Sequence, residues 1–475
     1  MLECSAMNNK KIYLSLVLFA LIGHTVQAAT DEKNYLSVSP FYMEPGEMVT
    51  VDLNLVNAQS VCAYQTDLVL PKGMSVTYEV EEGEVYMDIY VTSDRTSNNR
   101  HIVDASLQND GCVRIICYSN KNTAFNGNDG AVASISIKAD ESLTPGVYEL
   151  KLKNSEITLK ETLSAYHPAD FLTVVPVAEI KGNVLTLAGK YTEEAVKVLN
   201  ESLVDKAGIM VVDMQAVTAY DGTLNVYDNP NALIYCSKKL GVTNESNVIV
   251  NGLCENLVIT DGYPFATAGN FSITNGIYQR TLAVGRYGTI VLPFVVDIAT
   301  AASFEFYELQ EVGPDYLHFE IVESPEPGRP YLYINKGDAQ PTYLAATACE
   351  IGDNVEDSDE VGVWKMKATY NPIVITDASL LDKTYYISSN KIKNATKKLE
   401  ISPFRAYLEG PSFMDAFASS ANVIGIRLGK SSEIVPIEIC RDTNINMYDM
   451  TGRKIPQLVD GLYIKNGKKF YNIPR

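Results

Sequence analysis

Residues 48–55 read Met-Val-Thr-Val-Asp-Leu-Asn-Leu, a stretch in which apolar and polar side chains alternate. A period of two places successive side chains on opposite faces of a β-strand, so one face packs on a core and the other meets solvent. The pattern returns at residues 131–137 and 148–152, with Asn-Asp-Gly and Pro-Gly turns near these segments. Many short strands broken by such turns predict an antiparallel β-sandwich.

A change of rhythm after residue 182 predicts one helix. Thr192 is placed to cap its first turn, where Glu193 and Glu194 are favoured by the positive end of the helix dipole. Gly208 is expected to end the helix. Its apolar face consists of Ala195, Leu199 and Leu203.

Strands at residues 184–187 and 209–214 flank this helix, which predicts a parallel crossover unit. Short apolar runs at residues 232–235, 247–250 and 256–259 follow, with polar turns between them. Such runs bury their apolar faces by stacking on their neighbours, so the region resembles a short leucine-rich-repeat-like α/β solenoid.

Antiparallel character returns after residue 262 and predicts a second β-sandwich. Its clearest strand candidates are residues 289–294, 304–309, 316–321 and 330–334. The expected domains are therefore 1–28, a signal peptide; 30–178, the first sandwich; 183–262, the solenoid-like segment; 263–440, the second antiparallel β-sandwich; and 441–475, a C-terminal tail.

The N-terminus has the layout of a secretory signal peptide. Lys10 and Lys11 precede an apolar run at residues 12–22, and small residues stand at the cleavage positions in Val26-Gln27-Ala28. The run is shorter than the roughly 20 residues that a membrane-spanning helix needs, and no later segment reaches that length. We expect a chain with no membrane span that is located extracellularly or at the outer-membrane surface.

The net charge of the chain is −19, which makes an acidic surface. Such a surface repels phosphate groups, so nucleic acid and anionic membranes are not expected partners. Residues 441–475 are the exception, with seven basic and three acidic side chains. A basic tail on an acidic body indicates a separate role for the tail.

Four segments of the first sandwich carry a resemblance to cohesin-like modules. They are Pro45-Gly46-Glu47 before the strand at 49–51, the strand at 63–70, Gly130-Ala131-Val132-Ala133, and Thr144-Pro145-Gly146-Val147-Tyr148. The resemblance covers about 140 residues. It implies a jelly-roll sandwich related to carbohydrate-binding domains, and binding of a glycan or an extracellular protein.

Two further resemblances lie downstream. Residues 229–235, 260–265, 288–294 and 403–407 together look like a module of secreted proteins from gut and oral anaerobes. Residues 447–453 and 461–469 resemble the C-terminal sorting domain of type IX secretion. That resemblance implies a small C-terminal β-unit that contacts the secretion machinery; a structural hairpin that closes the preceding domain is the alternative.

The fold class that follows is mainly β and multi-domain. An N-terminal jelly-roll (cohesin-like) β-sandwich comes first, then the short leucine-rich-repeat-like α/β solenoid segment. A second antiparallel β-sandwich and a small C-terminal β-unit complete the chain.

No residue set in the sequence has the spacing of an active site. His101, His167 and His318 stand apart, without a second histidine at metal-ligand spacing. The serine-nucleophile and phosphate-loop glycine motifs are absent. The acidic run at residues 353–360 offers oxygen ligands for calcium but lacks the EF-hand pattern, so a solvated hairpin tip is the preferred interpretation.

Aromatic side chains are the remaining candidates for a binding site. The alternation around Trp364, the single tryptophan, favours a core position. Tyrosines can stack on sugar rings, yet most tyrosines in sandwiches are packing residues, and the sequence does not separate the two roles. Those in the first sandwich include Tyr64, Tyr78, Tyr86, Tyr90 and Tyr118.

The cysteines that follow the signal peptide are odd in number and lack Cys-x-x-Cys spacing. Neither a zinc site nor a disulfide framework fits them, and isolated buried thiols are the expected state. Cys112 and Cys117 would need a turn between them to pair, whereas residues 113–116 have the pattern of a strand. The seven are Cys62, Cys112, Cys117, Cys236, Cys254, Cys349 and Cys440.

The sequence therefore predicts a non-catalytic secreted or cell-surface protein that binds a glycan or a protein partner through its cohesin-like module. A structural adhesin or matrix component is one alternative. A polysaccharide-processing accessory protein or an enzyme with dispersed residues is another. No catalytic, cofactor-binding or metal-binding residue is predicted, no cofactor is expected, and the ligand-binding residues are unknown.

Overall fold

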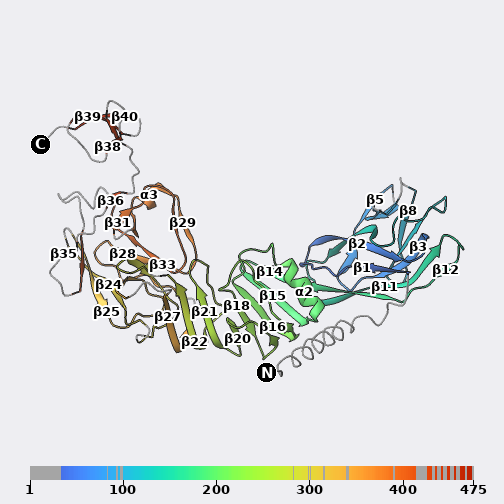
Figure 1. Cartoon of the computed structure of the whole chain (residues 1–475), viewed down its shortest axis with the longest axis horizontal. Coiled ribbons are helices and arrows are strands. Elements are labelled where there is room, and N and C mark those ends of the chain that lie inside the picture. Colours follow the sequence, from blue (N-terminus) through green and yellow to red (C-terminus); the bar gives the residue numbers. More distant parts are fainter. Residues whose placement is uncertain are drawn as a thin grey trace, which may run out of the picture. The chain divides into compact units, whose positions relative to one another are not determined.

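The computed structural model of the chain shows a mainly β protein, as the sequence predicts (Figure 1). The predicted signal peptide, residues 1–28, lies outside the described residues. The structure describes residues 34–82, 84–92, 95–96, 100–281, 283–297, 299, 301–313, 316–337, 342–352, 354–388, 391–412, 425–429, 434–435, 440–441, 447–449, 454–455, 461–465 and 468–472.

The chain forms two compact units whose segments interleave in sequence. Unit 1 consists of residues up to Ala207 together with Asp213–Asn225 and Lys239–Thr243. Unit 2 consists of Gly208–Val212, Val226–Lys238 and the residues from Asn244 onward. The domain boundaries predicted after residues 178, 262 and 440 stay predictions.

Unit 1 contains a sandwich of two sheets. One sheet has the order β1-β2-β10-β4, with β7 also paired to β10, and consists of β1 (Asn34–Val38), β2 (Met48–Asn57), β10 (Ala131–Ala139), β4 (Met74–Val76) and β7 (Ile89–Val91). The other has the order β12-β11-β3-β9-β8, with β13 also paired to β11. Its strands are β12 (Ala165–Tyr166), β11 (Gly146–Leu159), β3 (Val61–Val69), β9 (Val113–Tyr118), β8 (Ile102–Leu107) and β13 (Phe171–Val177).

The alternating stretch at residues 48–55 is β2, and its pattern places the core. Val51 and Leu53 are buried, whereas Asp52 between them and Thr50 before them are exposed. Val51 lies opposite Ile135 in the antiparallel register of β2 and β10. Apolar residues of both sheets fill one cluster, which confirms a two-layer sandwich.

The remainder of unit 1 holds the longer of the two helices found in the described residues. It includes the neighbouring strands β14 (Glu179–Lys181), β15 (Val184–Lys190) and β16 (Val211–Ala219, in this unit from Asp213), the helix α2 (Glu193–Ser202), and the parallel pair β17 (Asp221–Gly222) and β19 (Gly241–Val242). Among the described residues, no helix has the length and hydrophobicity needed to cross a membrane.

Helix α2 begins where the sequence predicts and ends earlier. The Thr192 side chain accepts a hydrogen bond from the Ala195 N–H at 3.3 Å, which confirms the cap. The expectation that Gly208 ends the helix is wrong, since the helix stops at Ser202 with Leu203 as its C-cap. Leu203 is the last buried residue of the apolar face, and Val204 beyond it is exposed, so further turns would bury nothing.

Unit 2 contains three larger sheets. The first has the order β18-β20-β21-β22-β27, with β18 (Leu233–Cys236), β20 (Val248–Val250), β21 (Leu253–Thr260), β22 (Phe271–Arg280) and β27 (Thr342–Ile351). The second has the order β23-β26-β24-β25-β34-β35, with β23 (Tyr287–Ile290), β26 (Tyr331–Asn335), β24 (Phe304–Val312), β25 (Tyr316–Val322), β34 (Gly425–Leu428) and β35 (Ile434–Val435). The third has the order β28-β33-β30-β31-β36, with β28 (Lys365–Thr369), β33 (Arg405–Glu409), β30 (Thr384–Ser388), β31 (Lys391–Asn394) and β36 (Cys440–Arg441).

Smaller elements complete unit 2. They are the antiparallel pair β29 (Ile373–Ile375) and β32 (Leu399–Ile401), the short helix α3 (Ala378–Leu381), and a C-terminal sheet of order β38-β37-β39-β40. The strands of that sheet are β37 (Met447–Asp449), β38 (Lys454–Ile455), β39 (Gly461–Lys465) and β40 (Lys468–Asn472).

Strand direction in unit 2 follows the predicted change of character only in part. In the region predicted as solenoid-like, residues 183–262, β18 pairs in parallel with β20, whereas β20 pairs antiparallel with β21. β21 pairs in parallel with β22, which lies beyond this region. Most later pairs are antiparallel, such as β24 with β25 and β28 with β33. The small C-terminal β-unit is present as the antiparallel sheet β37–β40.

Candidate functional site

An amphipathic hairpin projects from the sandwich of unit 1. Its strands are β5 (Tyr78–Glu81) and β6 (Glu84–Met87), which pair with each other and with no other strand in the described part of the chain. Tyr78 lies opposite Met87, and Val80 lies opposite Val85. Because side chains alternate along a strand, these four share one face, and the hairpin's glutamates and Tyr86 occupy the other.

The apolar face of this hairpin is uncovered to an unusual degree. Tyr78 is 59% exposed, Val80 60% and Val85 55%. Leu107, at the end of β8 in the neighbouring sheet, is 65% exposed. Large apolar side chains that gather on one surface without burial mark an interaction site more often than they mark a free surface.

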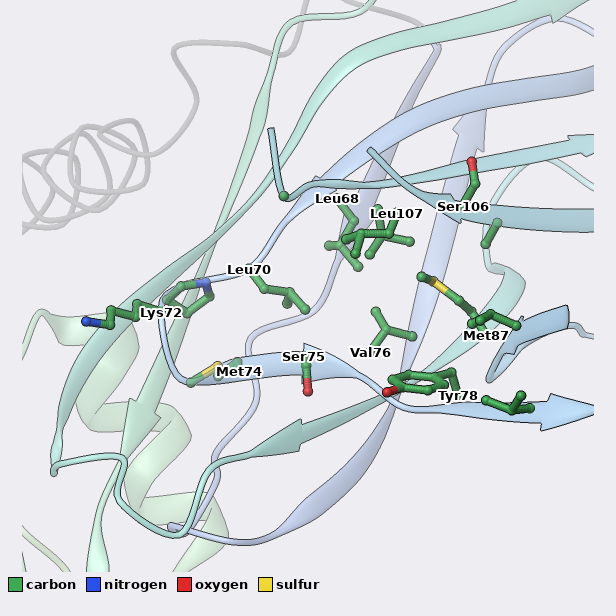
Figure 2. Close-up of a pocket in the computed structure, with 16 residues that line it drawn as sticks. Leu68, Leu70, Lys72, Met74, Ser75, Val76, Tyr78, Met87, Ser106 and Leu107 are labelled. Atoms are coloured by element: carbon green, nitrogen blue, oxygen red, sulfur yellow. The ribbon is translucent and has the colours of Figure 1, made fainter. Parts of the chain in front are cut away.

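These side chains line one groove with a volume of about 680 Å³. Figure 2 shows Leu68 and Leu107 on one side of the space, with Val76, Tyr78 and Met87 facing them. The walls therefore come from both sheets of the sandwich and from the hairpin. We call this space the hairpin groove; its lining residues are Leu68, Leu70, Pro71, Lys72, Met74, Ser75, Val76, Tyr78, Val80, Val85, Met87, Ala105, Ser106, Leu107, Gly111 and Val113.

The local sequence explains why the groove stays open. The turn between β8 and β9 contains Gly111, whose φ of +85° belongs to a region that a side chain rarely adopts, and a Cβ there would meet no atom within 4 Å. The other wall belongs to a separate two-stranded hairpin. The groove therefore lies between the β8–β9 turn and the hairpin.

The chemistry of the groove is that of apolar contact. Among its lining residues, Lys72, Ser75, Ser106 and the Tyr78 hydroxyl are the polar side-chain groups, and no carboxylate or histidine is present. An acid–base pair for hydrolysis is therefore lacking in this space. The groove is suited to holding apolar side chains of a ligand.

The structure separates the tyrosines proposed as a stacking reservoir. Tyr78 lines the hairpin groove, and Tyr64 is buried in the sandwich core. Tyr86 donates a hydrogen bond to Glu84 at 3.0 Å, and Tyr90 donates one to Asp88 at 3.2 Å; both rings are exposed. Tyr118 is exposed on β9, on the face opposite the core. They do not form one stacking platform.

The three histidines lie apart. His101 is buried and stacks on Phe125, with 4.1 Å between the ring centroids. Its Nε2 lies 2.9 Å from the Thr123 carbonyl oxygen. Burial lowers the pKa of His101 despite this hydrogen bond. His318 Nε2 lies 3.0 Å from the Gly429 carbonyl, and His167 is exposed.

The acidic run does not gather around a common centre in its described residues. Asp357 Oδ2 pairs with Lys367 at 2.9 Å and with Lys365 at 3.3 Å. Burial opposes ionisation of Asp357, but its hydrogen bonds with these lysines hold its pKa below the usual value. Within the described residues, no group of three or more His, Cys, Asp or Glu side chains is arranged to hold a metal ion.

The single tryptophan and the described cysteines occupy the places that the sequence predicts. Trp364 is buried against Tyr385. Residues 113–116 belong to β9, so a strand separates Cys112 from Cys117. Five cysteines are buried and Cys349 is half-buried, and these six form no disulfide; the five are Cys62, Cys112, Cys117, Cys236 and Cys254.

Sequence reasoning missed most of the hairpin groove. It singled out Tyr78 as one tyrosine among many and did not consider Val80, Val85 or Leu107. A signal was present, because Tyr-Glu-Val-Glu followed by Glu-Val-Tyr-Met alternates across a short turn. That pattern predicts a hairpin with one apolar face, but it does not say whether the face is covered.

Comparison with known proteins finds solved structures that are similar to part of this chain. The neighbours are cohesin modules. A cohesin from Clostridium thermocellum, solved in a type I cohesin–dockerin complex, is 10% identical over 31% of this chain and 99% of its own, with a TM-score of 0.26. A module from Clostridium acetobutylicum is 18% identical over 31% of this chain and 91% of its own, with a TM-score of 0.25.

A non-cellulosomal cohesin from the archaeon Archaeoglobus fulgidus is 14% identical over 31% of this chain and 91% of its own, with a TM-score of 0.24. Solved cohesin modules are thus similar to about a third of this chain. No family profile matches the sequence, and no curated protein does.

Proposed function

We propose that this chain is a non-catalytic secreted or cell-surface protein whose sandwich in unit 1 binds an extracellular protein partner in the hairpin groove. The observation that carries the proposal is the exposed apolar lining on Tyr78, Val80, Val85 and Leu107. Burying an aliphatic side chain fully contributes about 1.5–3 kcal/mol, so covering these partly exposed groups supplies about 4 kcal/mol in favour of binding.

A protein partner fits the groove better than a glycan. Sugar recognition pairs an aromatic platform with several polar side chains that bind hydroxyl groups. The groove has one aromatic residue, Tyr78, and its aliphatic walls offer few groups for hydroxyls. Aliphatic and aromatic side chains of a polypeptide would fill the same space without losing hydrogen bonds to water.

The test uses the full chain and a variant matched to it. Leu107→Arg places a charge at the rim of the groove, and because Leu107 is mostly exposed the fold is expected to persist. Proteins retained from a cell-surface extract are identified, purified and measured individually against both chains. A purified protein that binds the unaltered chain and loses at least tenfold in affinity for the variant supports the proposal.

Other outcomes decide against it. Equal binding to both chains places the partner elsewhere on the surface. Retention of polysaccharides alone on a glycan array, with loss in the variant, would replace the protein partner by a glycan. Concentration-dependent self-association of the unaltered chain that Leu107→Arg removes would favour the structural adhesin or matrix component.

Export is part of the proposal and has its own measurement. Cleavage after Ala28 predicts a mature N-terminus at Ala29, which N-terminal sequencing of the exported protein reads directly. Proteolysis of intact cells then shows whether the chain is accessible at the surface. A protein recovered from the cytosol with residues 1–28 attached would contradict this part.

A further inference from the structure

The hairpin groove runs beside an unpaired sheet edge. β8 is the last strand in the order β12-β11-β3-β9-β8, and in the described part of the chain it pairs with β9 alone. An edge strand offers a row of free N–H and C=O groups to another strand. β8 is therefore a place where a further strand can be added.

The turn fixes which backbone groups of β8 are free. The Gln108 N–H donates to the Cys112 carbonyl at 2.8 Å, so the backbone groups of Gln108 face β9. In an antiparallel ladder this orientation alternates from residue to residue. The backbone groups of Val103, Ala105 and Leu107 consequently point away from β9, toward the open edge.

The same residues direct their side chains toward the groove side of the sheet. Val103 and Ala105 pack on the core of the sandwich, and Ala105 and Leu107 line the hairpin groove. A strand added to β8 would extend this sheet, and every second side chain would point in the same direction as Leu107. Those side chains would enter the groove and meet the apolar face of the β5–β6 hairpin.

We propose that β8 accepts an extended segment of the protein partner as an added β-strand. This inference rests on the proposed function, and it specifies how the partner is held. Backbone hydrogen bonds to Val103, Ala105 and Leu107 give the pairing, and alternate apolar side chains of the segment occupy the groove.

Charge identifies the chemistry of the segment. Residues 78–88 contain five carboxylates and no lysine or arginine, and β8 itself carries Asp104. Asp104 is exposed on the face of β8 that points away from the core, where a cross-strand partner would lie beside it. The segment is therefore expected to alternate apolar side chains with lysine or arginine.

The same charges argue against a second copy of this chain at the edge. Two β8 strands side by side would bring Asp104 and the acidic hairpins of both copies together. Like charges across a strand pair are destabilising. A basic segment of another protein meets no such repulsion.

The first experiment selects ligands without assuming a sequence. A display library of random twelve-residue peptides is panned on the full chain and, in parallel, on Leu107→Arg. Enriched peptides are expected to alternate apolar and basic residues and to bind at least tenfold more weakly to Leu107→Arg. If panning on the unaltered chain enriches no peptide beyond the level reached on Leu107→Arg, both the proposed function and the inference are contradicted.

The second experiment separates strand addition from simple groove filling. Ala105→Pro removes one outward N–H and leaves the hydrogen bonds between β8 and β9 intact, and edge strands accept proline in this orientation. Ala105→Val is the control, since it keeps the N–H. We expect the selected peptide to bind about tenfold more weakly to Ala105→Pro than to Ala105→Val.

Hydrogen exchange on the unaltered chain gives a reading that does not depend on the proline variant folding. The amides of Val103, Ala105 and Leu107 should exchange rapidly in the free chain and slow at least tenfold when the peptide is bound. A peptide that loses affinity for Leu107→Arg while these amides stay unprotected overturns strand addition and leaves the proposed function standing.

Discussion

Arg405 and Asp261 are joined by two hydrogen bonds, from Nη1 to Oδ1 at 2.6 Å and from Nη2 to Oδ2 at 2.7 Å. The pair links β33 to the residue that follows β21, across two sheets of unit 2. The Tyr278 hydroxyl donates to the same carboxylate, and Arg280 lies 3.7 Å from it. One carboxylate thus faces two guanidinium groups in a largely buried setting.

Replacement of Asp261 by asparagine should destabilise unit 2, because Arg405 and Arg280 would then lack a carboxylate. Breaking a fully buried pair costs about 3–5 kcal/mol, and since about a fifth of each side chain is exposed we expect a loss of roughly 2–3 kcal/mol. Trp364, the single tryptophan, is buried in unit 2, so its fluorescence during urea unfolding measures the loss.

Asp261→Asn combined with Arg405→Met is the control for this prediction. Removing both members of the pair should cost less than the sum of the two single changes, because each single change removes the same two hydrogen bonds between Arg405 and Asp261. Strict additivity would show that the two side chains do not stabilise each other.

The same pair predicts a pH dependence. Burial raises the pKa of Asp261, but the hydrogen bonds from Arg405 and Tyr278 and the two arginine charges outweigh it, so the folded-state pKa lies below the usual 3.8. A lowered pKa means that the unfolded chain binds the proton more readily. The stabilisation is therefore complete above the unfolded-state pKa and is lost as the pH falls through the folded-state value.

Urea unfolding of unit 2 at a series of pH values between about 5 and 2 checks this dependence. The free-energy difference between the unaltered chain and Asp261→Asn should be constant at the upper end and shrink at the lower end. A difference that grows on acidification would reverse the sign and contradict the assignment.

Arg95 should be a stabilising residue of unit 1. Its buried guanidinium donates to the carbonyls of Asn126 at 2.6 Å and Gly127 at 3.0 Å, and also to the Leu55 carbonyl and the Asn57 side chain. Arg95→Met fills similar space but leaves these acceptors without donors. Because unsatisfied buried acceptors cost about 1–3 kcal/mol each, we expect a loss of about 3 kcal/mol.

Hydrogen exchange, read on proteolytic fragments of the chain that contain β2 and β10, measures this loss of stability in unit 1. The Trp364 transition serves as the control, since the tryptophan belongs to unit 2 and should unfold at the same urea concentration in both chains. Unchanged protection in β2 and β10 would mean that water satisfies the freed carbonyls.

Burial should make the thiols of the folded chain unreactive. It raises the pKa of Cys117 to about 12 and that of Cys254 to about 11, with nearby hydrogen bonds opposing the rise. At pH 8, iodoacetamide should leave both residues unlabelled in buffer and label them in urea, and mass spectrometry reads each site. Labelling of Cys117 at the same rate in both conditions would show that the core opens freely.

The strands of the sandwich could be predicted from the sequence because their information is local. In β2, Val51, Leu53 and Leu55 alternate with polar residues, and the buried face follows from the pleat alone. The start of α2 at Thr192 is equally local, since a hydroxyl needs only the first turn to bond. The end of the helix was predicted wrongly, because it depends on where neighbouring elements stop covering its apolar face.

The binding groove could not be predicted in the same way. Tyr64 lies on β3 of the sandwich and Tyr78 on β5 of the projecting hairpin; the first is buried and the second is mostly exposed. Their difference comes from what packs over each strand, and that depends on residues distant in sequence. Leu107 illustrates the same point, since only the pairing order makes β8 an edge.

The sequence by itself determined the class of structure, which is mainly β. Alternation of apolar and polar residues can be recognised in one strand without knowing which strand pairs with it. It also determined the chain's acidic charge and the absence of familiar catalytic motifs. The tertiary structure decided which apolar face and which sheet edge are left open within the described part of the chain. Exposure is a property of all neighbours in space, and a strand's own residues do not specify those neighbours.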